Sequence, residues 1–160
     1  MTQKRGGRGR SRRREDTLPA LQVISEHFTA LAAGNSEGMN ALRSPDFVLD
    51  FVCADAFESG TLSVETAQEF WPSWFTAFPE MDYHVTRTIA AENVIVAQWV
   101  FTGTHAGPLG PPIFEERVGP TGRTVRLRGV SIFDVSEGLI RRETTYTDLA
   151  TLWVELGVES

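Results

Sequence analysis

Residues 81–147 contain four successive strand candidates, and this run limits the fold more than any other part of the chain. The candidates cover residues 81–89, 94–105, 123–135 and 139–147, separated by turns or by a Gly/Pro-rich loop. Consecutive strands of this kind pair antiparallel. Because helical patterns come first and strands afterwards, the sequence predicts an α+β domain with N-terminal helices packed on a curved, mostly antiparallel sheet.

The first helix candidate, residues 17–33, has an apolar residue every three or four positions, which predicts an amphipathic helix. Its apolar stripe consists of Leu21, Ile24, Phe28 and Leu31. His27 is placed beside this stripe, at the surface or the edge of the helix. Ser36 can begin a short second helix.

A strand candidate at residues 47–53 follows, with Phe47, Leu49 and Phe51 on one face. Asp50 is on the other face, and it is either exposed at a strand edge or a second carboxylate that faces a cavity. We count Phe51 and Asp50 among the candidate substrate-binding residues.

Residues 63–78 form a third helix candidate with a broad aromatic stripe. Its members are Trp71, Trp74 and Phe78, widened by Phe70 and Phe75. The stripe is either core packing or a lid over an apolar ligand cavity, and on the second interpretation Trp74 and Phe75 contact the substrate. Pro72 inside the helix predicts a kink or two short helices.

The strand at residues 94–105 alternates between two faces. Trp99 and His105 share the face that we expect to line the interior of a cone between helices and sheet, with His105 at its mouth. Trp99 is then a candidate substrate-binding residue. A loop histidine that is hydrogen-bonded to backbone is the alternative for His105.

The last strand ends at Asp148, where the pattern changes to a helix that stops at Gly157. Asp148 is a candidate catalytic acid/base, and Tyr146 on the same strand face is a candidate to hold a substrate oxygen. The alternative is that Asp148 caps the following helix. The two roles are compatible.

Composition narrows the class of protein. The 160 residues suit one domain, which we expect to span residues 17–160. Residues 1–16 hold seven basic and two acidic side chains and are predicted to be a disordered tail. The tail is either an arm that contacts nucleic acid, an electrostatic tether to an acidic partner, or a solvated extension without a role. We favour the last, since the rest of the chain is acidic and repels phosphate.

The sequence shows no pattern for several other kinds of functional site. Metal-ligand spacings, a phosphate loop and a dinucleotide fingerprint are absent, so we expect no metal and no cofactor. Cys53 is predicted to be a buried thiol. Without a secretory signal or a membrane-spanning apolar run, the chain is predicted to be cytoplasmic.

Several short motifs resemble the SnoaL-like polyketide cyclase family, which belongs to the NTF2-like superfamily of cone-shaped α+β barrels. They are FPEM at residues 78–81, FTGTHAG at 101–107, TGR at 121–123, FD at 133–134, YTD at 146–148 and LG at 156–157. The resemblance implies a cofactor-independent ester cyclase that closes a ring on a polyketide-like substrate by intramolecular aldol condensation. It also implies that Asp148 is the acid/base and that His105 lies near the developing enolate.

The same superfamily leaves other functions open. The alternatives are another small-molecule lyase, isomerase or hydrolase, or a non-catalytic module that binds an apolar ligand. Alternating apolar residues such as Val96 and Val100 on the other sheet face predict a homodimer, or a tetramer, formed through the sheet.

Overall fold

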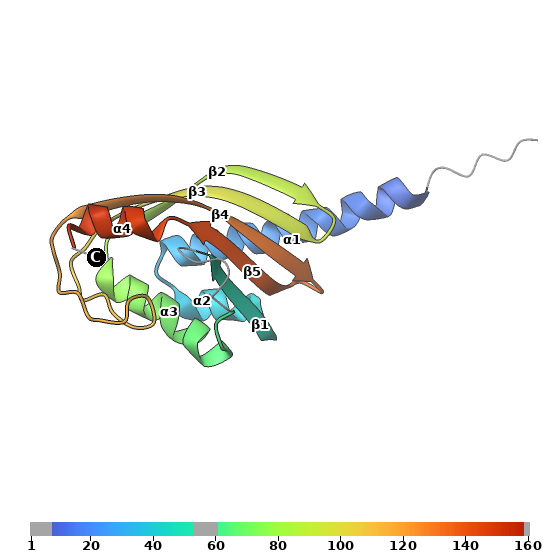
Figure 1. Cartoon of the computed structure of the whole chain (residues 1–160). Helices are drawn as coiled ribbons and strands as arrows, with labels where there is room; N and C mark the ends of the chain where they lie inside the picture. The colour runs from blue at the N-terminus through green and yellow to red at the C-terminus, as the bar shows by residue number, and fades with distance from the viewer. Residues whose placement is uncertain (1–7, 53–60, 159–160) are drawn as a thin grey trace, which may run out of the picture.

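A curved five-stranded sheet forms one layer of the molecule (Figure 1). The computed structural model describes residues 8–52 and 61–158, with side chains from residue 19 onwards. The strands are β1 (Arg43–Val52), β2 (Met81–Ala91), β3 (Val94–Thr104), β4 (Thr124–Ser136) and β5 (Leu139–Thr147), in the order β1-β5-β4-β3-β2. β1 is parallel to β5, and the other neighbours are antiparallel. This confirms the predicted α+β class.

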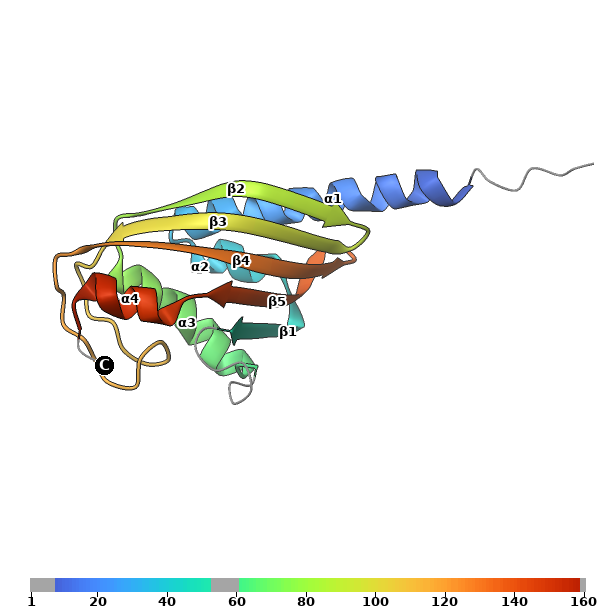
Figure 2. The ribbon, with the colours of Figure 1, turned by 45° about the horizontal axis from the view of Figure 1, so that its top comes forward.

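Three helices cover one face of the sheet and lie behind the strands in Figure 2. They are α1 (Arg8–Ala32), α2 (Ser36–Ala41) and α3 (Val64–Ala77). A fourth helix, α4 (Leu149–Leu156), follows β5 and packs beside β4. It ends at Gly157, whose φ of 67° is the left-handed conformation that glycine adopts most easily. No helix within the described residues is long and apolar enough to cross a membrane.

The core lies between these helices and the inner face of the sheet. On β3 the buried positions are Ile95, Ala97, Trp99, Phe101 and Gly103, which confirms the predicted inner face. The α1 residues Ile24, Phe28 and Leu31 are buried as well. Burying one large apolar side chain contributes about 1.5–3 kcal/mol. Packing of these stripes therefore fixes the helices over the sheet and sets the width of the space between them.

Two elements begin earlier than predicted. α1 begins at Arg8 rather than near Thr17, and β1 begins at Arg43 rather than at Phe47. β1 can run through Pro45 because it is an edge strand, and its pairing with β5 is interrupted between Arg43 and Val48. The early start brings Arg43 into the sheet.

The structure also bears on the predictions for Pro72 and for the N-terminal tail. α3 is one helix that includes Pro72, rather than two short helices. The helical segment from Arg8 overlaps the stretch predicted to be disordered, while residues 1–7 and Cys53 lie outside the described residues. The domain boundary at residue 16 stays a prediction.

Candidate active site

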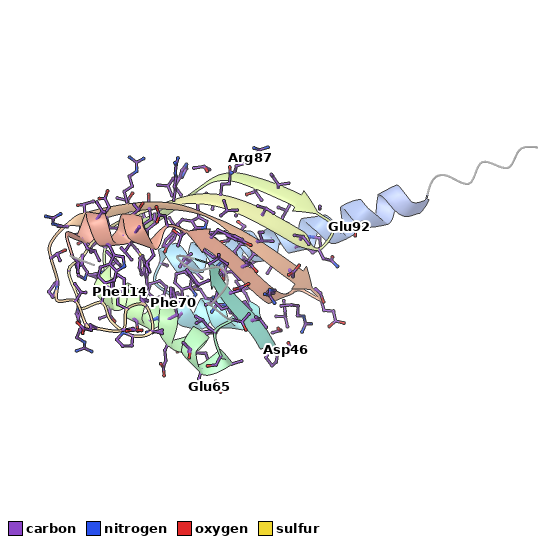
Figure 3. All side chains as sticks on the ribbon, viewed as in Figure 1. Asp46, Glu65, Phe70, Arg87, Glu92 and Phe114 are labelled. Atoms are coloured by element: carbon purple, nitrogen blue, oxygen red, sulfur yellow. The ribbon has the colours of Figure 1, made fainter. Side chains whose placement is uncertain are left out.

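A cavity of about 220 Å³ lies between the helices and the inner face of the sheet. Most of its wall is aromatic. The aromatic residues that line it are Phe28, Phe51, Phe70, Trp71, Trp74, Tyr83, Trp99 and Phe101. Side chains fill the space between helices and sheet in Figure 3, where Phe70 is labelled on α3. An apolar, aromatic-lined cavity of this kind suits a small organic ligand.

Three of the six predicted substrate-binding residues line this cavity. Phe51 from β1, Trp74 from α3 and Trp99 from β3 are all part of its wall. Phe75 instead stacks on Trp71, with ring centroids 6.0 Å apart, and packs against the apolar core. The aromatic stripe of α3 is therefore both core packing and cavity wall.

Four polar side chains on three neighbouring strands form a connected chain at the cavity wall. Trp99 Nε1 donates to Ser131 Oγ at 2.9 Å, and Ser131 Oγ lies 2.7 Å from Thr145 Oγ1. Thr145 Oγ1 then donates to Glu143 Oε1 at 3.0 Å. Ser131, Thr145 and Glu143 are buried and line the cavity. Glu143 is thus a carboxyl group on the inner face of β5.

Arg43 from β1 lies beside this carboxyl group. Its Nη2 is 3.7 Å from Glu143 Oε2, and its Nη1 donates to Asn40 Oδ1 at 3.2 Å. The guanidinium carbon is 4.5 Å from the centre of the Phe47 ring. The side chains of Arg43 and Glu143 are only 6% and 4% exposed. The structure therefore contains a buried ion pair next to the cavity.

The prediction that His27 is a surface or edge residue is wrong. His27 is 0% exposed and packs edge-on against Phe28 and Phe133, with ring centroids 5.3 and 5.2 Å away. Burial, and then the nearby positive charge of Arg43, lower the pKa of His27 to about 3. His27 is therefore a neutral part of the core behind the Arg43–Glu143 pair.

Burial dominates the electrostatics of the carboxyl group and of the phenol near it. Burial raises the pKa of Glu143, and the Arg43 charge and the Thr145 hydrogen bond offset only part of this. Burial also raises the pKa of Tyr83, with the Glu143 charge adding to the effect. Glu143 is consequently able to hold a proton at higher pH than an exposed glutamate, and Tyr83 remains a phenol.

Asp148 has a different environment. It lines the cavity but is exposed, and it caps α4 by accepting hydrogen bonds from Ala150 N and Thr151 Oγ1, both at 2.9 Å. The Thr151 hydrogen bond is the largest cause that lowers the pKa of Asp148. The helix-capping interpretation is thus realised in the structure. The acid/base assignment of Asp148 stays a hypothesis.

His105 is fully buried at the end of β3 and is not part of the cavity wall. Its Nδ1 accepts a hydrogen bond from Thr121 N at 3.1 Å, and Arg123 and Gly122 bond to its backbone. Burial lowers the pKa of His105, and the Gly107 backbone offsets part of this. His105 therefore ties the end of the 106–122 loop to the end of β3, and it does not line the cavity that Glu143 and Asp148 line.

Tyr146 and Asp50 lie on the outer face of the sheet. Tyr146 is 47% exposed, and Asp50 Oδ2 accepts a hydrogen bond from Arg142 Nη2 at 2.9 Å. Neither lines the cavity. The register explains why, since both are on the strand face opposite to Glu143 and Thr145.

Sequence reasoning missed Glu143, Thr145, Ser131, Arg43 and Tyr83. For Glu143 and Thr145 the sequence signal was ambiguous, because both faces of β5 carry polar residues and only the register places Thr145 opposite Ser131. Arg43 had no local signal, because only the tertiary position of β1 brings it to Glu143. Among the residues that the structure describes, no group of three or more His, Cys, Asp or Glu could hold a metal ion.

Comparison with solved structures places the fold. One similar structure is a protein from Jannaschia sp. CCS1 that is described as a proposed SnoaL-like polyketide cyclase. It is 18% identical with a TM-score of 0.75, and the alignment covers 99% of this chain and 100% of that one. AclR, a proposed hydroxylase from Streptomyces galilaeus, is 21% identical with a TM-score of 0.75 and coverage of 88% and 97%. An epoxide hydrolase of the LEH-like type from M. tuberculosis is 12% identical with a TM-score of 0.61 and coverage of 88% and 90%. At these identities the likeness concerns the fold.

Sequence comparison gives the family. No match was found among proteins with curated functions. The profile of the SnoaL-like domain matches residues 24–143, which includes α2, α3 and strands β1 to β4 and ends at Glu143. Since this match covers well over half of the sequence and the fold agrees with it, the chain belongs to the SnoaL-like domain family.

Proposed function

We propose that this protein is a cofactor-independent acid/base enzyme that closes a ring on a polyketide-like ester by intramolecular aldol condensation, with Glu143 as the acid/base group. The observation that carries the proposal is a buried carboxyl group of raised pKa at the wall of an aromatic cavity. A base whose pKa is closer to neutrality transfers protons efficiently in both directions.

The reaction needs few groups. The Glu143 carboxylate takes a proton from a carbon between two carbonyl groups, which leaves an enolate. The enolate carbon bonds to a ketone carbon of the same molecule, and the new alkoxide takes the proton back from the Glu143 acid. Tyr83 lines the same cavity and remains protonated, so it can donate a hydrogen bond to the enolate oxygen.

Polyketide chemistry is the substrate class that the relatives suggest. The Jannaschia structure is described as a SnoaL-like polyketide cyclase, and flat conjugated intermediates suit a wall of aromatic rings. The hydroxylase and epoxide hydrolase among the neighbours show that the same fold is associated with other reactions. The catalytic test therefore begins with proton transfer, which cyclisation requires.

The test is hydrogen exchange from a β-keto ester in heavy water, followed by NMR, with ring closure followed by mass spectrometry. Glu143→Gln is expected to slow exchange by about 100-fold or more, since general acid/base groups contribute that much or more. Asp148→Asn is the matched variant, because asparagine also caps helices well, and it is expected to retain exchange. Circular dichroism checks that both variants fold.

Each other outcome has a clear meaning. Loss of exchange in Asp148→Asn alone would transfer the acid/base role to Asp148, as the sequence resemblance implies. Exchange retained in both variants, with apolar ligands still bound, would leave a binding module without this chemistry.

The homodimer also stays a proposal. The outer face of the sheet brings together half-buried Val96, Val100 and Val130 around the exposed Tyr146. A second copy packed there would remove these apolar side chains from water. Analytical ultracentrifugation at micromolar concentration is expected to give the mass of a dimer, and a monomer would contradict this.

A further inference from the structure

When Glu143 is ionised, the hydrogen-bond chain from Trp99 to Glu143 has only one arrangement of hydrogens that satisfies all its members. An indole N–H can only donate, and a hydroxyl group donates one hydrogen and accepts others. Trp99 therefore makes Ser131 Oγ an acceptor at 2.9 Å. The single hydrogen of Ser131 is left to donate to Thr145 Oγ1, 2.7 Å away. The single hydrogen of Thr145 then donates to Glu143 Oε1 at 3.0 Å.

The reverse arrangement leaves a buried hydrogen without a partner. If Glu143 carried its proton on Oε1 and donated to Thr145, Thr145 would donate to Ser131, which already accepts from Trp99. The hydroxyl hydrogen of Ser131 would then have no acceptor among the hydrogen bonds of the described residues, although Ser131 is only 2% exposed. A buried donor without a partner costs more than a typical hydrogen bond contributes.

We propose that Trp99, Ser131 and Thr145 are positioning residues that direct a hydrogen bond at Oε1 of Glu143 and so stabilise its ionised form. This inference rests on the proposed role of Glu143 for its catalytic meaning.

The two oxygens of Glu143 have different surroundings. Oε1 has the Thr145 hydrogen bond, whereas Oε2 has no hydrogen-bond partner among the described residues. Arg43 of β1 faces Oε2 at 3.7 Å, too far for a hydrogen bond but close enough to favour the carboxylate. The other titratable groups around the pair are His27 of α1 and Tyr83 of β2.

Gly129 on β4 fixes the position of the Trp99 indole, the first member of the hydrogen-bond chain. Gly129 pairs with Trp99, and a Cβ at this position would collide with Trp99 Cζ2 and Cη2. Only glycine therefore lets the indole lie close to β4 with Nε1 at Ser131. This close approach sets the direction of the whole chain, because Trp99 is its only member that cannot accept.

Infrared difference spectroscopy during a pH titration tests the assignment without any substrate. The carbonyl stretch of protonated Glu143 is identified as the band that is lost in Glu143→Gln. Thr145→Val is expected to raise the pKa of Glu143, measured as the midpoint of this band, because the lost donor stabilises the ionised form more. Thr145→Ser keeps the donor and is expected to keep the wild-type midpoint.

The opposite result is equally clear. A midpoint that is the same in Thr145→Val, Thr145→Ser and wild type would overturn the inference. If Thr145→Val does not fold, Ser131→Ala interrupts the hydrogen-bond chain one step away and is expected to shift the midpoint in the same direction by less, and no shift would again overturn it. Exchange activity in Glu143→Gln would instead refute the proposed function and leave the hydrogen-bond assignment standing.

Discussion

Two carboxylates five residues apart, one on β5 and one directly after its end, have opposite environments in this molecule. Glu143 is inside, next to Arg43, with a pKa raised by burial. Asp148 is exposed at the end of the strand, with a pKa lowered mainly by the Thr151 hydrogen bond and with both oxygens occupied by α4. The difference shows that a position at the end of a strand gives access to solvent, whereas a position on the inner face gives the altered pKa that proton transfer uses.

The largest expected effect is a loss of stability, and it distinguishes the buried ion pair from a surface pair. Arg43→Leu leaves the buried Glu143 without its positive partner, and we expect the free energy of unfolding to fall by about 3–5 kcal/mol. Arg141→Leu is the control, since Arg141 contacts Glu137 and Asp46 on the surface, and it is expected to cost about 1 kcal/mol or less. Urea denaturation measures both. Equal losses would mean that the Arg43–Glu143 environment is not distinct from the surface.

A smaller effect is a difference in how the two carboxylates respond to pH. Because its folded pKa is raised, Glu143 is protonated in the folded state over a range where the unfolded chain has lost the proton. Its contribution is therefore full below the unfolded pKa and is lost as pH rises through the folded pKa. Asp148 has a lowered folded pKa, so its contribution is present above the unfolded pKa and is lost as pH falls through the folded pKa.

Denaturation curves recorded between acid and neutral pH check these opposite signs. As pH rises, wild type is expected to lose stability relative to Glu143→Gln. As pH rises through the acid end of the range, wild type is expected to gain stability relative to Asp148→Asn. The same sign for both carboxylates would remove the distinction drawn between them.

The fold was predictable because its signals are local and repeated. The β3 alternation that puts Trp99 and Phe101 inside is visible in the sequence and holds in the structure. The capping role of Asp148 and the stop at Gly157 were also readable, because both depend on a few neighbouring residues. The predicted stripe on α1 left out His27, which lies three residues after Ile24 and one before Phe28, and so fits the same helical face.

The site was harder to predict because it depends on contacts between distant segments. On β5 both faces carry polar residues, so the pattern does not say whether Glu143 and Thr145 or Thr144 and Tyr146 point inward, and a shift of one residue exchanges the faces. The register with β4 decides it by placing Thr145 opposite Ser131. Arg43 reaches Glu143 only because the first strand of the chain pairs parallel to the last.

The most direct test of the account is a titration of both carboxyl groups in one sample. Carbon-13 labelled glutamate and aspartate would be followed by NMR, with Glu143→Gln and Asp148→Asn used to assign the two resonances. The account predicts a Glu143 pKa above the ordinary glutamate value of 4.5 and an Asp148 pKa below the ordinary aspartate value of 3.8. A Glu143 pKa at or below 4.5, together with a raised pKa for Asp148, would contradict it and return the acid/base role to the strand end.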